Sequence, residues 1–173
     1  MPQSDARVTI VGPDEVGPGV STANGENGRL SWHFVADTVN DFAWGTARNY
    51  VWQTTRATIP GRGIVPLHMY YLPGRANLFR DADTLGRHAL EFYSKLWIPY
   101  EFPQMSMIDG PSAGMEYPMV VMSNRGAADH EIAHAWWPMM VGNNETWYGW
   151  MDEGFNQYMN VLSGVGRRDP AQA

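Results

Sequence analysis

The chain has 173 residues, a length typical of one domain, and its 44% hydrophobic and 17% charged residues exclude an intrinsically disordered protein. The net charge is −6 and no basic block is present, so we expect no nucleic-acid partner, while the absence of cysteine excludes disulfides. The apolar runs are far shorter than a membrane span and the first residues lack the pattern of a signal peptide, so we expect no membrane span and, as expressed, a cytoplasmic location.

The beginning of the chain is rich in glycine, proline, asparagine and serine, which is typical of turns between short strands. Residues 7–11 have the composition of a strand, and residues 17–19 and 24–28 have that of turns. A further strand with one buried face is predicted by the alternating apolar residues Leu30, Trp32 and Phe34.

The middle of the chain alternates between strand and helix patterns. Residues 50–59 and 63–72 are rich in β-branched and aromatic side chains, which predicts two strands, and Pro66 places the second at a sheet edge or near a strand start. Residues 82–97 are predicted to form a helix with the apolar stripe Leu85, Ala89, Phe92 and Leu96. The carboxylates expected to cap its first turn are those of Asp81 and Asp83.

Two strands and two helices are predicted in the remainder of the chain. The strands are residues 104–108 and 115–123, and the first helix is residues 127–141, where the internal Pro138 is expected to kink or end it. The second helix begins near Met151, has the apolar stripe Phe155, Tyr158, Met159 and Leu162, and is expected to end at Gly164, Gly166 and Pro170. The sequence therefore predicts a mixed α+β fold.

The segment His130-Glu131-Ile132-Ala133-His134 is an H-E-x-x-H motif. On a helix, residues four apart lie on one face about one turn apart, so both imidazoles can bind one zinc ion. Glu131 points about 100° away from His130, which makes it the expected catalytic base rather than a ligand. The alternative interpretation is a helix with two exposed histidines and a solvated glutamate.

A third ligand is available further along the chain. Glu153 follows His134 after 18 residues and lies at the start of the predicted helix near Met151. A carboxylate at this position completes a His₂Glu site, in which one zinc ion per chain keeps an open position for water. The alternative is a glutamate in a first helical turn, which the helix dipole favours without any metal.

The H-E-x-x-H motif, followed by Glu153 in the setting Trp-Met-Asp-Glu-Gly-Phe, resembles the M1 zinc aminopeptidases within the gluzincins. The segment Gly114-Met115-Glu116-Tyr117-Pro118 is similar to that family's G-x-M-E-N element, and residues 141–145 are similar to its link between the zinc helices. The resemblance implies a thermolysin-like α+β catalytic subdomain with a mixed β-sheet and active-site helices. It further implies that residues 1–44 are a remnant of a β-rich amino-terminal domain and that residues 45–173 are part of the catalytic domain.

In the resembled enzymes, the glutamate of the G-x-M-E-N element binds the free α-amine of the substrate. The resemblance therefore implies that Glu116, with Gly114 and Met115, binds a peptide or amino-acid amide and directs cleavage to its first peptide bond. The chain departs from the family pattern at Tyr117, where the family has asparagine. The alternative for Glu116 is an ordinary surface glutamate on an edge strand.

The resembled enzymes also stabilise the oxyanion with a tyrosine well downstream of the glutamate ligand, whereas this chain ends 20 residues after Glu153. We therefore expect zinc binding with weak hydrolysis, because losing one oxyanion donor costs about 10²–10³ in rate. Tyr148 is the local candidate for that role, since Tyr117 and Tyr158 are expected to face elsewhere. Helices left uncovered would expose apolar faces, so we expect a homo-oligomer.

Other interpretations stay open at this point. The enzyme could be a gluzincin endopeptidase or a promiscuous zinc ester or amide hydrolase, and a non-catalytic module stabilised by zinc is the candidate from another class. Asn156 and Gln157 share a helix face with Glu153, where they either contact a metal ligand or form ordinary polar surface. His88 is expected to face solvent. The sequence leaves the side-chain preference and the native compartment open.

Overall fold

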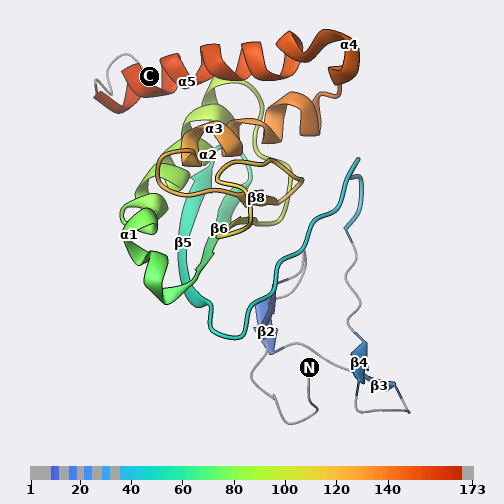
Figure 1. The fold of residues 1–173 in the computed structure, drawn as a ribbon. Coiled ribbons are helices and arrows are strands. Elements are labelled where there is room, and N and C mark those ends of the chain that lie inside the picture. The colour runs from blue at the N-terminus through green and yellow to red at the C-terminus, as the bar shows by residue number, and fades with distance from the viewer. Residues whose placement is uncertain (1–8, 12–15, 19–21, 25–28, 32–35, 169–173) are drawn as a thin grey trace. The chain divides into compact units, whose positions relative to one another are not determined.

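The computed structural model describes residues 9–11, 16–18, 22–24, 29–31 and 36–168, and the chain divides into the units Met1–Val39 and Asn40–Ala173 (Figure 1). The first unit contains two short antiparallel pairs. Its strands are β1 (Thr9–Val11), β2 (Val16–Pro18), β3 (Thr22–Asn24) and β4 (Arg29–Ser31). Strands were predicted at β1 and β4. The turn predicted at residues 17–19 is wrong, because Val16–Pro18 pairs with β1. Trp32, Phe34 and residues 25–28 lie outside the described residues.

The second unit is built on a mixed four-stranded sheet with the strand order β5-β6-β7-β8. Strands β5 (Val51–Ile59) and β6 (Gly63–Tyr71) form an antiparallel hairpin, whereas β7 (Met105–Ile108) and β8 (Val120–Met122) continue the sheet in parallel. The predicted strands at residues 50–59, 63–72 and 104–108 are therefore confirmed. β6 is an inner strand, contrary to the edge position expected from Pro66. Because β7 pairs with β6 only from Leu67 onward, the proline lies where β6 has one neighbour.

The predicted strand at residues 115–123 is only partly correct. Pairing is continuous over Val120–Met122, and Met115 returns to form one antiparallel bridge with Met122. The residues between them do not form a strand, because Pro118 lacks an amide hydrogen and Met119 has a φ of +64°. Glu116 therefore lies in a loop beside the sheet and not within an extended edge strand.

Helix α2 (Ala82–Leu96) covers one face of the sheet, and the turn η1 (Pro73–Arg75) and helix α1 (Ala76–Phe79) connect β6 to it (Figure 1). The predicted helix is confirmed, but its buried face is shifted, since Leu96 is 40% exposed. The side chains of α2 that are buried against the sheet and α3 include Ala82, Ala89, Leu90 and Tyr93. Asp81 makes no capping hydrogen bond and has a φ of +63°, so the expected cap is absent at that residue.

Helix α3 (Ala128–Ala133) packs beside α2 and is followed by the π-helical segment η2 (Ala135–Met140). The single helix predicted for residues 127–141 is therefore wrong, although the expected break at Pro138 is confirmed. Trp137 has non-helical dihedrals of −132° and 110°, because a residue before proline is driven towards extended conformations. α3 ends at Ala133, and His134, the second histidine of the H-E-x-x-H motif, is the residue that follows it as the C-cap.

The last part of the chain folds as α4 (Glu145–Gly149), the π-helical turn η3 (Trp150–Gly154) and α5 (Phe155–Arg168). Helix α5 lies on the side of α2 and α3 that faces away from the sheet (Figure 1). It continues through Gly164 and Gly166, contrary to the expectation that these glycines end it, and Pro170 lies outside the described residues. Its buried residues are Asn156, Met159, Ser163 and Gly166. Of the predicted apolar stripe, Met159 is buried and Leu162 half-buried, whereas Phe155 and Tyr158 are exposed. None of the described helices has the length and apolar character needed to cross a membrane.

Candidate metal and catalytic site

The two histidines of the H-E-x-x-H motif lie at the carboxyl end of α3 with their Nε2 atoms 3.3 Å apart. Glu153 reaches them from η3, and its Oε2 atom lies 3.3 Å from Nε2 of His130 and 3.8 Å from Nε2 of His134. Two zinc–nitrogen bonds of about 2.0–2.1 Å at a tetrahedral angle place their nitrogens about 3.3–3.4 Å apart. The spacing of the three ligand atoms therefore fits one tetrahedral zinc ion.

Both histidines present the nitrogen that a metal needs. His134 is fully buried, and its Nδ1 atom donates to the carbonyl oxygen of Trp137 at 2.9 Å. Oδ1 of Asp152 lies 2.7 Å from the same nitrogen. The Nδ1 atom of His130 lies 2.8 Å from Oδ1 of Asn160. An imidazole with its hydrogen on Nδ1 has a lone pair on Nε2, which is the form that binds a metal.

Glu131 lies beside the ligands and is 5% exposed. The pKa of Glu131 is raised to about 7, chiefly by burial; His130 and His134 act to lower it, and the carboxylates of Glu116 and Glu153 act to raise it. The backbone of Gly114 lies against this carboxylate, and a β-carbon added to Gly114 would overlap Oε1 of Glu131. A glycine is therefore needed at residue 114 for the loop to approach the carboxylate this closely.

Glu116 is brought to the same place by the loop that precedes β8. One ligand atom each from Glu116, Glu131 and His134 lie within 4.8 Å of one another. The loop is anchored by Met115, whose amide donates to the carbonyl oxygen of Met122 at 3.0 Å and whose carbonyl oxygen accepts from the amide of Met122 at 2.8 Å. The structure thus gathers the residues that the sequence singled out, although Met115 contributes through its backbone.

The remaining candidate residues are the tyrosines Tyr148 and Tyr158 and the polar pair Asn156 and Gln157. Tyr148 lies on α4 with 48% of its side chain exposed, and Tyr158 is 61% exposed on α5. Asn156 is fully buried, and its Nδ2 atom donates to the carbonyl oxygen of His130 at 3.0 Å, whereas Gln157 is exposed. Asn156 is therefore in contact with a candidate ligand, and Gln157 forms ordinary polar surface.

Sequence reasoning missed two polar residues beside the candidate ligands. Asp152 is 5% exposed, and burial raises its pKa to about 6, with His134 acting in the opposite direction. Asn160 lies one turn after Asn156 on α5 and contacts His130. The spacing of four residues between Asn156 and Asn160 was the signal that could have identified Asn160.

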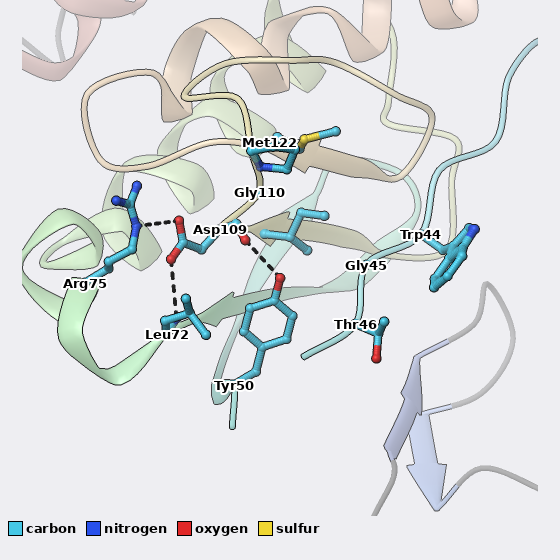
Figure 2. Close-up of a pocket in the computed structure, with 11 residues that line it drawn as sticks. Trp44, Gly45, Thr46, Tyr50, Leu72, Arg75, Asp109, Gly110 and Met122 are labelled. Atoms are coloured by element: carbon cyan, nitrogen blue, oxygen red, sulfur yellow. Dashed lines mark hydrogen bonds and ion pairs between the residues drawn. The ribbon is translucent and has the colours of Figure 1, made fainter. Parts of the chain in front are cut away.

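A separate cavity of about 580 Å³ lies where β6 and β7 end (Figure 2). Asp109 is its central polar residue, and its carboxylate pairs with Arg75 at 2.7 Å. The hydroxyl of Tyr50 donates to the carbonyl oxygen of Asp109 at 2.9 Å. These bonds give Tyr50, Arg75 and Asp109 partners within the protein, and the lining of the cavity includes none of the candidate ligands.

No protein-family model matches the chain. It is 26% identical over 163 residues to a leukotriene A-4 hydrolase homolog from Botryotinia fuckeliana, a match that covers 85% of this chain and 24% of the relative. The chain thus spans about a quarter of the length of that curated relative.

Solved structures of M1 zinc metallopeptidases share the fold. A mutant of a two-domain M1 enzyme has a TM-score of 0.54 in complex with L-arginine, at 16% identity over 70% of this chain and 29% of that one. Its complex with L-tryptophan has a TM-score of 0.56, at 19% identity over 70% and 30% of the two chains. A mutant M1 enzyme from Deinococcus radiodurans has a TM-score of 0.55, at 17% identity over 69% and 29%. The chain therefore has the α+β fold of part of the M1 zinc metallopeptidases, the family that its motifs resemble.

Proposed function

We propose that the protein is a zinc-dependent aminopeptidase in which His130, His134 and Glu153 hold one zinc ion. The observation that carries this proposal is the convergence of their three ligand atoms within 4.8 Å of one another, next to the buried carboxylate of Glu131. The similarity to M1 zinc metallopeptidases supports the choice of metal and reaction class. Residues 45–173 are proposed to be part of the catalytic domain, and residues 1–44 to be a remnant of the preceding β-domain.

The reaction proposed is hydrolysis of a peptide bond by water. When bound, zinc polarises the substrate carbonyl and makes water more acidic. Glu131 accepts a proton from the attacking water and returns it to the leaving amine. Its carboxylate lies close both to His134, a proposed metal ligand, and to Glu116, the proposed amine-binding residue. The side chain of Glu153 is 59% exposed, so the ligand cluster is open to water and substrate on that side.

Glu116 is proposed to determine that cleavage occurs at the amino-terminal bond. Its carboxylate lies with that of Glu131 in the group of atoms within 4.8 Å, where it can accept a charge-assisted hydrogen bond from a substrate α-ammonium group. The backbone of Met115 is hydrogen-bonded to β8, which fixes the loop that carries Glu116. The expected substrates are therefore peptides and amino-acid amides with a free amine.

The test compares Glu131→Gln with the unaltered chain, using amino-acid fluorogenic amides and a zinc assay. Glu131→Gln should bind one zinc ion per chain and lose hydrolysis, because it keeps the ligands and removes the base. Zinc binding without hydrolysis in the unaltered chain would favour the non-catalytic, zinc-stabilised module instead. Hydrolysis that persists in the variant would contradict the role given to Glu131.

A further inference from the structure

His130 is linked to a chain of hydrogen bonds that crosses three helices. Its Nδ1 atom lies 2.8 Å from Oδ1 of Asn160 on α5, and Nδ2 of Asn160 lies 3.0 Å from the hydroxyl oxygen of Tyr93 on α2. The Tyr93 hydroxyl lies 3.0 Å from Oδ2 of Asp129, the residue before His130 on α3. The chain of contacts therefore begins and ends at adjacent residues of α3.

The direction of each hydrogen bond follows from the chemistry of Asp129. A carboxylate only accepts hydrogen bonds, and Asp129 accepts from Tyr93 on Oδ2 and from the hydroxyl of Ser163 on Oδ1 at 2.7 Å. Because the Tyr93 hydrogen is directed to Asp129, its oxygen is left to accept the amide hydrogen of Asn160. The carbonyl oxygen of Asn160 must then face His130, whose Nδ1 atom must carry the hydrogen.

A competing contact exists on the same nitrogen. Nδ2 of Asn156 lies 3.4 Å from Nδ1 of His130, a position from which it could donate to an unprotonated Nδ1. The same amide nitrogen already donates to the carbonyl oxygen of His130 at 3.0 Å. The shorter bond to Asn160 favours the Nδ1–H tautomer, and removing it would leave Asn156 to favour the other.

We propose that Asp129, Tyr93 and Asn160 form a positioning relay that fixes His130 as its Nδ1–H tautomer and leaves its Nε2 lone pair directed at the metal. That Nε2 of His130 binds a metal rests on the proposed function. Tyr93 is fully buried, so its two hydrogen bonds compete with little water. The relay also gives the buried Ser163 of α5 a hydrogen-bond partner, because its hydroxyl donates to Asp129.

The first experiment uses the metal-free chain and requires no zinc. Nitrogen-15 NMR of the histidine rings, assigned with His130→Gln, reports which nitrogen of His130 carries the hydrogen. The unaltered chain should show the Nδ1–H tautomer, and Tyr93→Phe and Asn160→Leu should shift His130 towards Nε2–H. The matched controls are Tyr71→Phe, which removes the hydroxyl of another buried tyrosine, and Gln157→Leu, which changes an exposed amide on α5.

The second experiment measures zinc affinity by competition with a chromophoric chelator. Asn160→Leu should weaken zinc binding by about 10–100-fold, the usual effect of losing the partner of a metal-binding histidine. Asn160→Asp restores an acceptor for Nδ1–H and should recover most of that loss, while both controls should match the unaltered chain. Circular dichroism checks that each variant folds.

Two results would overturn the relay. One is an Nε2–H tautomer for His130 in the unaltered chain, and the other is an unchanged tautomer in both Tyr93→Phe and Asn160→Leu. If the unaltered chain bound no zinc, the proposed function would fail, and the NMR result would still decide for or against the relay.

Discussion

The backbone of Gly114 lies directly against the carboxylate of Glu131, so that a β-carbon on residue 114 would overlap Oε1. This contact joins the loop that carries Glu116 to the helix that carries both histidines. Since the atom that would be displaced is the end of a flexible side chain, a larger residue at 114 should move the carboxylate and leave the fold intact.

Gly114→Ala is therefore expected to lower kcat while zinc affinity and thermal stability stay close to those of the unaltered chain. A displacement of a catalytic group by about 1 Å can cost on the order of 10²-fold in rate. Gly74→Ala is the matched control, because a β-carbon there meets no atom within 4 Å. Steady-state kinetics and a zinc assay decide the matter, and equal kcat values for the two variants would contradict the role of this contact.

Glu116→Ala is expected to lower kcat/KM for amino-acid amides and to leave simple esters without a free amine unaffected. Loss of a hydrogen bond to a charged group, about 1.5–3 kcal/mol, corresponds to about a 10–100-fold change. Glu101→Ala, which removes an exposed carboxylate from another loop, serves as the control. An equal loss for amides and esters would show that Glu116 does not recognise the amine.

The exposed face of α4, η3 and α5 predicts self-association. It presents the large side chains Trp147, Trp150, Tyr158 and Val161, which are 76%, 61%, 61% and 62% exposed. Large exposed apolar side chains on neighbouring elements favour association, so light scattering at micromolar concentration should give a mass above that of the monomer. The double variant Trp150→Ser with Tyr158→Ser should lower that mass, whereas a monomeric unaltered chain would refute the homo-oligomer.

His68 gives the folded protein a pH dependence of known sign. It is 2% exposed on β6, its Nδ1 atom accepts from the indole nitrogen of Trp52 at 3.2 Å, and burial lowers its pKa below the ordinary value of 6.5. The unfolded chain therefore binds this proton more readily, so the stability due to His68 is present above pH 6.5 and is lost as the pH falls.

The raised pKa values of Glu131 and Asp152 act in the opposite direction, because they favour the folded protein as the pH falls. The test must therefore compare urea midpoints of the unaltered chain with those of His68→Gln, which contains both carboxylates. Between pH 7.5 and pH 5.5, the urea midpoint of the unaltered chain should fall by more than that of His68→Gln. Parallel pH profiles would contradict the interpretation.

Local patterns were sufficient for the parts of the site that depend on one element. The spacing of four residues predicted that the imidazoles of His130 and His134 lie together, and their Nε2 atoms are 3.3 Å apart. The order of motifs led to the expectation that Glu153 lies near them. The helix at residues 82–97 and the strands β5 and β6 also followed from periodicity and composition, although their pairing as a hairpin was not predicted. These features are determined by side chains close in the sequence, where helix and strand geometry suffices.

Features that depend on contacts between elements were not predicted. The face of α5 that is buried is the polar one, since Asn156 and Asn160 bond to His130 and Ser163 bonds to Asp129. Apolar periodicity assigns burial by hydrophobicity alone, so it predicted Met159 correctly but also selected Phe155 and Tyr158, which are exposed. The loop that contains Glu116 was not predicted for a local reason. Met119 has a positive φ, which the apolar pattern of a strand does not reveal.

The most direct test of the zinc site is anomalous diffraction at the zinc absorption edge, recorded from crystals of the unaltered chain grown with one equivalent of zinc. A single peak bonded to Nε2 of His130, Nε2 of His134 and the carboxylate of Glu153 is the result that the structure predicts. A peak elsewhere, or a Glu153 turned away from an empty pair of histidines, would contradict the account.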